Sequence, residues 1–407
     1  MPQPPSLRIG IEEEYQIVHP DTRNLRYIVT RSANQERPVL RSRQGDQPLS
    51  DALTASIQAL SAPTCANVTE ARERLHAQRV AICELAQEMG LLVAASGTHP
   101  FASWKQPDVP LPGRYQGMVG DLQVIAERLL IFGMHVHIGI ENRETQIQIM
   151  NVIRYFLPHI LCISTNSPFW MGMDTGLMSY RSKLFERFPR TGIPDYFNGW
   201  AQFEGYVDIL MRTGCIDNPK KIWWDVRPHP KFPTLEIRVC DLPMRVDETI
   251  AIAALIQAIV AKLYKLFEQN LTFRVYPRIL LVENKWRAVR YGLEGKLIDF
   301  GKQKELPAPD LIRELIDFVE DVVDDLGTRR YIEYIYQILE MGSGAQRQLR
   351  VWRETNSLEA VARYIHAETM IGLLQDVSPY LATTLHPPSP EAIQEKMQSL
   401  TKPDDLI

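Results

Sequence analysis

Three consecutive glutamates, Glu12, Glu13 and Glu14, lie in an apolar stretch near the start of the chain. Residues two apart on a β-strand face the same way, so a strand here points Glu12 and Glu14 together. Two carboxylates on one buried face repel each other unless a cation or an arginine lies between them. The pattern favours such a charged partner, and the alternative is an exposed edge strand that carries a solvated acidic patch.

A second segment, residues 133–139, repeats this spacing with histidines. His135 and His137 are two apart, and Gly133 and Gly139 flank them and allow close approach of backbone or ligand. An H-x-H pair on a strand can bind zinc, but a tetrahedral site needs further ligands, and the chain has no H-E-x-x-H. A catalytic pair, a zinc hydrolase site and a satisfied structural pair therefore all remain open.

A third element consists of residues 223–228 and the stretch 234–241 that follows. On a strand, Thr234, Glu236 and Arg238 share one face, while the intervening apolar residues share the other. Glutamate supplies hard oxygen to Mg²⁺, and arginine supplies a fixed fork for phosphate. This face fits a phosphate-plus-metal site, and the alternative is a Glu–Arg pair on a solvated surface.

Three more arginines lie in positions suited to anion recognition. Arg114 precedes a tyrosine, Arg181 lies in Ser-Tyr-Arg-Ser, and Arg290 lies in Arg-Tyr-Gly. None of these arginines alone indicates a particular function. Together with the acidic and histidine strands, they indicate a site that handles several carboxylates or phosphates.

The elements that must position these side chains are a mixture of strands and helices. The expected strands are 7–18, 52–62, 91–95, 132–140 and 234–239. The expected helices are 69–90, 115–130, 145–164 and 247–270, with an almost wholly helical pattern from 306 to about 380. Residues 31–48 are expected to form a mobile loop, and 166–199 a long loop of the functional kind.

This mixture has no regular β-α-β alternation. The chain also has no G-x-G-x-x-G after a strand and no G-x-x-x-x-G-K-[ST], the phosphate-binding loops of two common nucleotide-binding folds. We therefore expect an α+β fold, with helices packed on one side of a largely antiparallel sheet. A single domain is expected over residues 1–380, followed by a polar, disordered tail over 381–407.

The composition excludes several classes of protein. The 407 residues carry 45 Lys+Arg against 49 Asp+Glu, a net charge of −4, and no segment is dominated by basic residues, so nucleic-acid and membrane-surface partners are not expected. The five cysteines have no C-x-x-C spacing and are typical of reduced thiols in the cytosol. No signal peptide is recognisable, and the apolar stretch 250–263 is shorter than a membrane span. We expect a cytoplasmic protein.

The ordered set of motifs resembles the type-2 glutamate–cysteine ligase family, also called carboxylate–amine ligases. The resemblance covers residues 7 to about 375 and rests on motifs that occur in one order. They are Gly10–Glu14, Ser96–Phe101, His135–Gly139, Ser179–Arg181, Trp224–Pro228, Glu236–Arg238 and Arg290–Leu293.

The resemblance implies a glutamine-synthetase-like fold with a curved antiparallel sheet, packed helices and a helical C-terminal part. It implies ATP-dependent amide-bond formation with Mg²⁺, in which a carboxylate, often the γ-carboxylate of glutamate, becomes an acyl phosphate that an amine attacks. The implied substrates are small amino acids, and we expect a homo-oligomer because of the apolar helices.

The resemblance also implies roles for individual residues. The implied metal ligands are Glu12, Glu14, His137 and Glu236. The implied catalytic residues are Glu236, Arg238 and Arg181, and the implied nucleotide-binding residues are His137, Trp224 and Arg238. The implied substrate-binding residues are Arg114, Arg181 and Arg290, and Tyr15 is a further candidate for the pocket wall.

One stretch departs from the family pattern. Family members usually carry one or two glutamates just before the position of Cys65, whereas residues 55–65 here contain no acid, and Ala55 and Ala59 stand at the expected positions. Compensation by Asp46 or Asp51, a site with fewer metals, and a member that has lost catalysis and acts as a nucleotide-binding or regulatory protein are three competing explanations.

Overall fold

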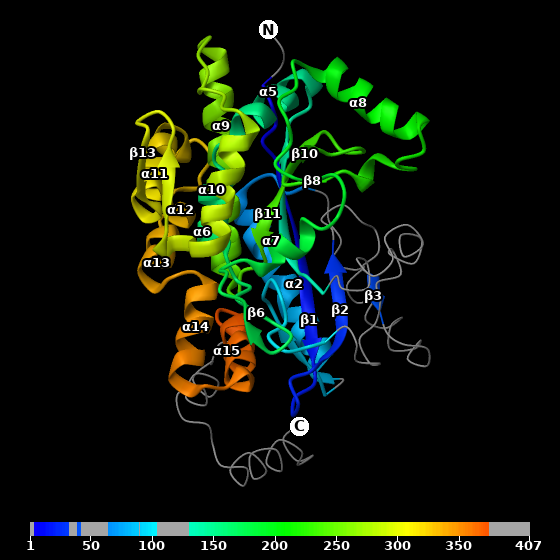
Figure 1. The fold of residues 1–407 in the computed structure, drawn as a ribbon, viewed down its shortest axis with the longest axis vertical. Coiled ribbons are helices and arrows are strands. Elements are labelled where there is room, and N and C mark those ends of the chain that lie inside the picture. The colour runs from blue at the N-terminus through cyan, green and yellow to red at the C-terminus, as the bar shows by residue number, and fades with distance from the viewer. Residues whose placement is uncertain (1–3, 32–38, 42–63, 89, 104–129, 374–407) are drawn as a thin grey trace.

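The computed structural model describes residues 4–31, 39–41, 64–88, 90–103 and 130–373. Its centre is a seven-stranded sheet in the order β10-β11-β5-β1-β2-β3, with β4 also paired to β1 (Figure 1). Every pairing in this sheet is antiparallel. The strands are β1 (Ile9–Val18), β2 (Leu25–Arg31), β3 (Val39–Arg41), β4 (Leu92–Ala94), β5 (Gly133–Gly139), β10 (Val226–Pro228) and β11 (Thr234–Asp241).

The helical layer packs on one face of this sheet. The long helix α9 (Val246–Glu268) lies against β5, and α2 (Val68–Glu88) lies between β1 and α9. On β1 the buried side chains of Ile9, Tyr15 and Ile17 belong to the face that meets these helices, as strand alternation requires. The α+β fold class with a largely antiparallel sheet is confirmed.

Helix α9 is apolar on nearly all sides because it is the core helix of this layer. Within the described part of the chain it is the one helix that is long and apolar enough to cross a membrane, but 72% of its most apolar stretch is buried in the fold. Neighbouring helices therefore account for its apolar surface.

The C-terminal part is helical, as the sequence predicts. It starts after the hairpin of β12 (Lys296–Asp299) and β13 (Lys304–Pro307) and lies to the left of the sheet in Figure 1. Its helices are α11 (Ala308–Val323), α12 (Arg329–Ile332), α13 (Tyr334–Met341), α14 (Gly344–Thr355) and α15 (Leu358–Met370).

The single helix predicted over 145–164 is wrong. The structure has two helices, α5 (Arg143–Ile153) and α6 (Leu157–Ser164), which meet at 68°. Pro158 lies in the first turn of α6. Proline has no N–H to donate to the carbonyl four residues earlier and its ring clashes there, so one continuous helix cannot pass through this point.

The stretch 166–199 is built of short elements connected by turns. They are β6 (Phe169–Trp170), β7 (Met173–Asp174), α7 (Tyr180–Phe185) and β8 (Thr191–Gly192). The chain continues through α8 (Trp200–Arg212) and β9 (Trp223–Trp224), and α10 (Arg278–Tyr291) follows α9. The predicted strand 52–62, helix 115–130 and tail 381–407, and most of the predicted loop 31–48, lie outside the described residues.

Candidate active site

The three glutamates of β1 alternate between the two faces of the sheet. β1 is an inner strand, paired on one side with β2 and on the other with β5, where Glu12 stands opposite His135. Glu12 and Glu14 therefore share the face that points away from the helices, and Glu13 lies on the other. The side chain of Glu12 is 14% exposed. An exposed edge strand with a solvated acidic patch is ruled out.

Both histidines of β5 contact the carboxylate of Glu12. Nδ1 of His135 lies 3.2 Å from Oε2, and Nε2 of His137 lies 3.1 Å from Oε1. The second ring nitrogen of His137 lies 3.2 Å from the hydroxyl of Thr234. Because both nitrogens of the fully buried His137 have partners in the chain, this residue orients Glu12, and His135 is better placed to offer a nitrogen to a ligand.

A β-bulge in β11 shapes the opposite side of the site. Two residues of β11, 238 and 239, stand opposite His135 in the interval where the register with β5 shifts. A bulge of this kind changes which face the following residues use and re-aims side chains. It leaves Glu236, Arg238 and Asp241 on the same face of the sheet as His135.

Glu236 lies between two guanidinium groups. Nε of Arg227, which stands opposite it on β10, lies 2.7 Å from Oε2, and Arg238 donates from Nη1 to Oε1. Nη1 of Arg238 also lies 3.4 Å from Nδ1 of His135. The acid/guanidinium face predicted for this strand is therefore present, in a buried setting.

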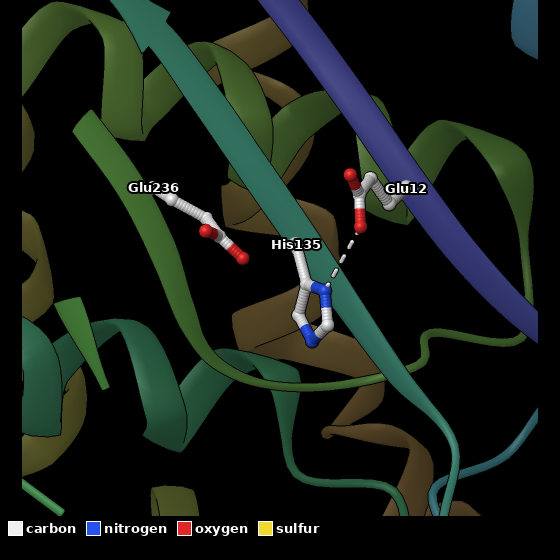
Figure 2. A group of neighbouring side chains, drawn as sticks. All are labelled: Glu12, His135 and Glu236. Carbon is white, nitrogen blue, oxygen red and sulfur yellow. Dashed lines mark hydrogen bonds and ion pairs between the residues drawn. The ribbon is translucent and has the colours of Figure 1, made fainter. Parts of the chain in front are cut away.

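Glu12, His135 and Glu236 form the candidate cation site (Figure 2). One ligand atom from each lies within 4.8 Å of the other two. The three side chains come from the adjacent strands β1, β5 and β11 and turn toward one space. Two carboxylates and one imidazole suit a divalent cation of the Mg²⁺ or Mn²⁺ type better than zinc, which favours nitrogen and sulfur donors.

The charges in this cluster are set by its neighbours. Burial alone would raise the pKa of Glu12, but the imidazoles of His137 and His135 outweigh it and hold that pKa well below its usual range. Burial likewise opposes ionisation of Glu236, and Arg227 and Arg238 hold its pKa far below normal. Both carboxylates are therefore ionised at neutral pH, as ligands of a cation must be.

The pKa values of the two imidazoles shift in opposite directions. Burial and the adjacent Arg238 lower the pKa of His135, so its ring is neutral and can donate a lone pair. Burial also favours a neutral His137, but the carboxylate of Glu12 outweighs it and raises the pKa of His137 above its ordinary value. His135 belongs with Glu12 and Glu236 to the group that could hold a cation, and His137 stays a predicted ligand.

Arg181 lies on the same face of the sheet, next to Gly133. A Cβ atom at Gly133 would lie 2.3 Å from Nη2 of Arg181, so the absence of a side chain there leaves room for the guanidinium. Glu14 accepts the backbone N–H of Gly133 at 2.9 Å. Arg181 is 3% exposed and lies 3.9 Å from the carboxylate of Asp241.

Asp241 holds the segment that carries Arg181. Its buried carboxylate accepts the N–H of Asn166 at 2.8 Å and the hydroxyls of Ser167 and Ser179 at 2.6 and 2.8 Å. Ser167 in turn accepts the backbone N–H of Arg181 at 3.1 Å. Burial raises the pKa of Asp241, and these donors with Arg181 oppose that rise.

Other predicted site residues lie apart from the cluster. Arg290, at the end of α10, donates to the carbonyl of Gly176 and lies over the ring of Tyr291. Trp224 is buried under α8, with its ring 5.4 Å from that of Tyr206 in an aromatic group.

Tyr15 was expected in the pocket wall and is on the wrong face. It shares the helix side of β1 with Glu13, to which its hydroxyl donates. Arg114, Ala55 and Ala59 lie outside the described residues, as do Asp46 and Asp51, which the sequence offers as compensating acids.

Lys285 of α10 is not among the residues predicted from the sequence, but the structure connects it to the site. Its buried Nζ lies 2.7 Å from the carboxylate of Asp225 and 3.2 Å from that of Glu186. The carbonyl of Asp225 accepts the N–H of Arg238 at 2.8 Å. The sequence signal is the Trp-Asp-Val-Arg-Pro motif, which places Asp225 directly before β10, the strand that carries Arg227.

The sequence of this chain is similar to those of several known proteins. The model of the family described as glutamate–cysteine ligase family 2 matches residues 8–369. A protein of Solibacter usitatus named "Putative glutamate–cysteine ligase 2" is 55% identical over 369 residues, which cover 91% of this chain and 95% of that protein. A protein of the same name from Herpetosiphon aurantiacus is 53% identical over 368 residues, which cover 90% and 94%.

A solved structure has a similar fold. It is the crystal structure of glutamate–cysteine ligase from Francisella tularensis in complex with AMP, with a TM-score of 0.58. The match covers 97% of this chain and 94% of that one at 11% sequence identity, so it supports the fold alone.

Proposed function

Because the chain belongs to glutamate–cysteine ligase family 2, we propose that it is an ATP-dependent ligase that joins a carboxylate to an amine. The proposed acid is the γ-carboxylate of glutamate, and cysteine is one candidate amine. The observation that carries the proposal is the group of Glu12, His135 and Glu236 beside Arg238, where a cation and an anion can be held next to each other.

The proposed reaction has two steps. A carboxylate oxygen attacks the γ-phosphorus of ATP, the bond from that phosphorus to the bridging oxygen breaks, and ADP leaves. The amine nitrogen then attacks the carbonyl carbon of the acyl phosphate, loses a proton and expels inorganic phosphate. Such chemistry depends on positioning and charge stabilisation more than on a protein nucleophile, and this matches a site made of acids, imidazoles and guanidinium groups.

Glu12, His135 and Glu236 are the residues we propose as ligands of Mg²⁺ or Mn²⁺. When bound, the cation would neutralise phosphate charge. His137 keeps Glu12 in place, and Glu14 stays a predicted ligand. The proposed nucleotide has Arg238 as its predicted phosphate contact and Trp224 as a predicted neighbour, and the Francisella tularensis ligase of similar fold was solved with AMP.

Arg181, Arg114 and Arg290 stay predicted contacts of the substrate carboxylates. The support is strongest for Arg181, which lies on the same face as the cluster, beside Gly133. The cytoplasmic location also stays a prediction from the sequence.

The test is release of ADP by the full chain with ATP, Mg²⁺ or Mn²⁺, glutamate and a panel of amines that includes cysteine. We expect ADP release to require both acid and amine, with the amide identified by mass spectrometry. Glu236→Gln should lower turnover at least about 100-fold because it removes charge from the cation site. Glu305→Gln, on the exposed hairpin strand β13, is the matched control and should behave like the parent.

The second candidate, a nucleotide-binding or regulatory protein without catalysis, is favoured by the missing acids at Ala55 and Ala59. Titration calorimetry with ATP, with and without Mg²⁺, separates the two. The ligase requires metal-dependent ATP binding. Three results together would contradict the ligase proposal. They are an ATP affinity that is the same with and without Mg²⁺, no amine-dependent ADP release across the panel, and a Glu236→Gln variant with the same turnover as the parent.

A further inference from the structure

The side chain of Lys285 is a buried ammonium that lies between two carboxylates outside the cation site. Its Nζ lies 2.7 Å from Oδ2 of Asp225 and 3.2 Å from Oε1 of Glu186. Burial would lower the pKa of Lys285, but the two carboxylates outweigh it and raise that pKa, so the group is charged. A buried charge is costly unless it is paired, so the ammonium keeps both carboxylates close to it. We call these three side chains the Lys285 bridge.

One end of the Lys285 bridge is the segment that carries two arginines beside the cation site. Asp225 stands directly before β10, whose Arg227 pairs with Glu236. The backbone carbonyl of Asp225 accepts the N–H of Arg238 at 2.8 Å, and its own N–H donates to the carbonyl of Gly192 at 2.9 Å. A displacement of Asp225 would therefore move the backbone of both arginines.

The other end of the Lys285 bridge is α7, which carries Arg181 and lies against β11 (Figure 1). Glu186 is the residue that ends α7, and Ser179 is the residue before its first turn. The carbonyl of Val289, one turn after Lys285 on α10, accepts the N–H of Ser179 at 3.2 Å. Helix α10 therefore holds both ends of α7, the first through a backbone carbonyl and the second through Lys285.

The two segments that the bridge joins meet again beside the cation site. Nη2 of Arg181 lies 3.4 Å from the backbone carbonyl of Arg238, in the bulge of β11. We propose that Lys285 is a positioning residue, which fixes the placement of Arg181 and Arg238 relative to each other. This inference rests on the proposed function, in which the two arginines contact the substrate carboxylate and the phosphate. A displacement of about 1 Å in such a group can slow a reaction about 100-fold.

The test compares the stability of two variants of the full chain, measured by thermal denaturation followed by circular dichroism. Lys285→Met removes the cation beside the buried Asp225, so the melting temperature should fall by about 5 °C or more. Lys285→Met/Asp225→Leu replaces the pair by apolar side chains and should recover most of that loss, because no charge of the pair is then left buried. Glu186 keeps Lys183 as its partner at 2.6 Å in both variants.

Turnover should not recover with stability. Assayed well below its melting temperature, each variant should have a kcat lower by about 10- to 100-fold and a KM for ATP within about threefold of the parent, because the misplaced arginines act in the transition state. Arg287→Met is the matched control and should equal the parent, since Arg287 of α10 also has two carboxylate partners at 3.0 Å, but at the protein surface. A parental kcat in either Lys285 variant would overturn the proposal and leave Lys285 a role in stability alone.

A second measurement does not depend on activity. A parent without amine-dependent ADP release would contradict the proposed function, and crystal structures of the parent and the double variant would then decide on Lys285. After superposition on β5, the Cζ atoms of Arg181 and Arg238 should be displaced by about 1 Å or more in the double variant. Guanidinium groups that keep their parental positions would show that Lys285 does not place them.

Discussion

The two faces of strand β1 give the same residue type opposite surroundings. On one face, Glu12 meets two histidines and lies in the candidate cation site. On the other face, Glu13 is buried in the core and paired with Arg79 of α2. Nη2 and Nε of Arg79 lie 2.5 and 2.9 Å from the two carboxylate oxygens of Glu13. Thr249 of α9 donates to it at 2.7 Å.

The difference lies in the kind of partner that each carboxylate has. The partners of Glu13 include one fixed positive charge and neutral hydroxyls, so its pairing is complete within the chain. The partners of Glu12 are imidazoles, one of which is neutral, and a second carboxylate stands nearby. A buried carboxylate whose partners all lie in the core, such as Glu13, stabilises the fold, whereas Glu12 and Glu236 face one space with His135 that could hold a cation.

The largest expected effect is on the core face. Arg79→Met should lower the free energy of unfolding by about 3–5 kcal/mol, because Glu13 then stays buried without a compensating charge. Urea denaturation followed by circular dichroism measures it. Arg313→Met removes one partner of an exposed pair with Asp310 and should change stability by less than about 0.5 kcal/mol. Equal losses of stability in the two variants would contradict the interpretation that the buried ion pair of Glu13 and Arg79 stabilises the fold.

The next effect separates the two faces directly. If the site face binds Mg²⁺ or Mn²⁺, the cation should stabilise the parent by about 2.7 kcal/mol at a hundred times its dissociation constant, and a chelator should reverse this. Glu12→Gln should abolish the cation-dependent rise in melting temperature. Glu13→Gln should melt at a lower temperature yet keep the same rise, and the reverse result would exchange the roles of the two faces.

A smaller effect is expected at Gly133, next to the cluster. Gly133→Ala places a methyl group where Nη2 of Arg181 now lies, and the end of a flexible side chain moves more easily than backbone. Stability should therefore change by less than about 1 kcal/mol, while ligase activity falls by about 10- to 100-fold as Arg181 is displaced. Gly205→Ala on α8, where a Cβ meets open space, is the matched control and should leave activity unchanged.

The alternation that builds this site could be predicted from the sequence because it is local. A period of two places Glu12 with Glu14 and His135 with His137 without knowledge of any other strand. The bulge in β11 could not be predicted, because it is a mismatch in register between two strands far apart in the chain. It is this bulge that brings Asp241 onto the face of Glu236.

The choice between the two histidines was also beyond the sequence. His137 contacts Thr234, which lies 97 residues further along the chain, and this contact depends on how β5 and β11 pair. The break between α5 and α6, in contrast, had a visible signal in Pro158. Local chemistry could be predicted, and pairings between distant segments could not.

The smallest effect concerns that same contact. Thr234→Val keeps the shape of the side chain and removes the hydroxyl 3.2 Å from Nδ1 of His137, which should cost about 1 kcal/mol of stability. Thr191→Val loses a comparable bond, from its hydroxyl to the carbonyl of Phe188 at 2.8 Å, and should cost a similar amount. If His137 orients Glu12, then Thr234→Val alone should also weaken cation binding several-fold, measured by titration calorimetry with Mn²⁺. Equal cation affinity in both variants would mean that His137, like Glu13, only stabilises the fold and does not influence the cation site.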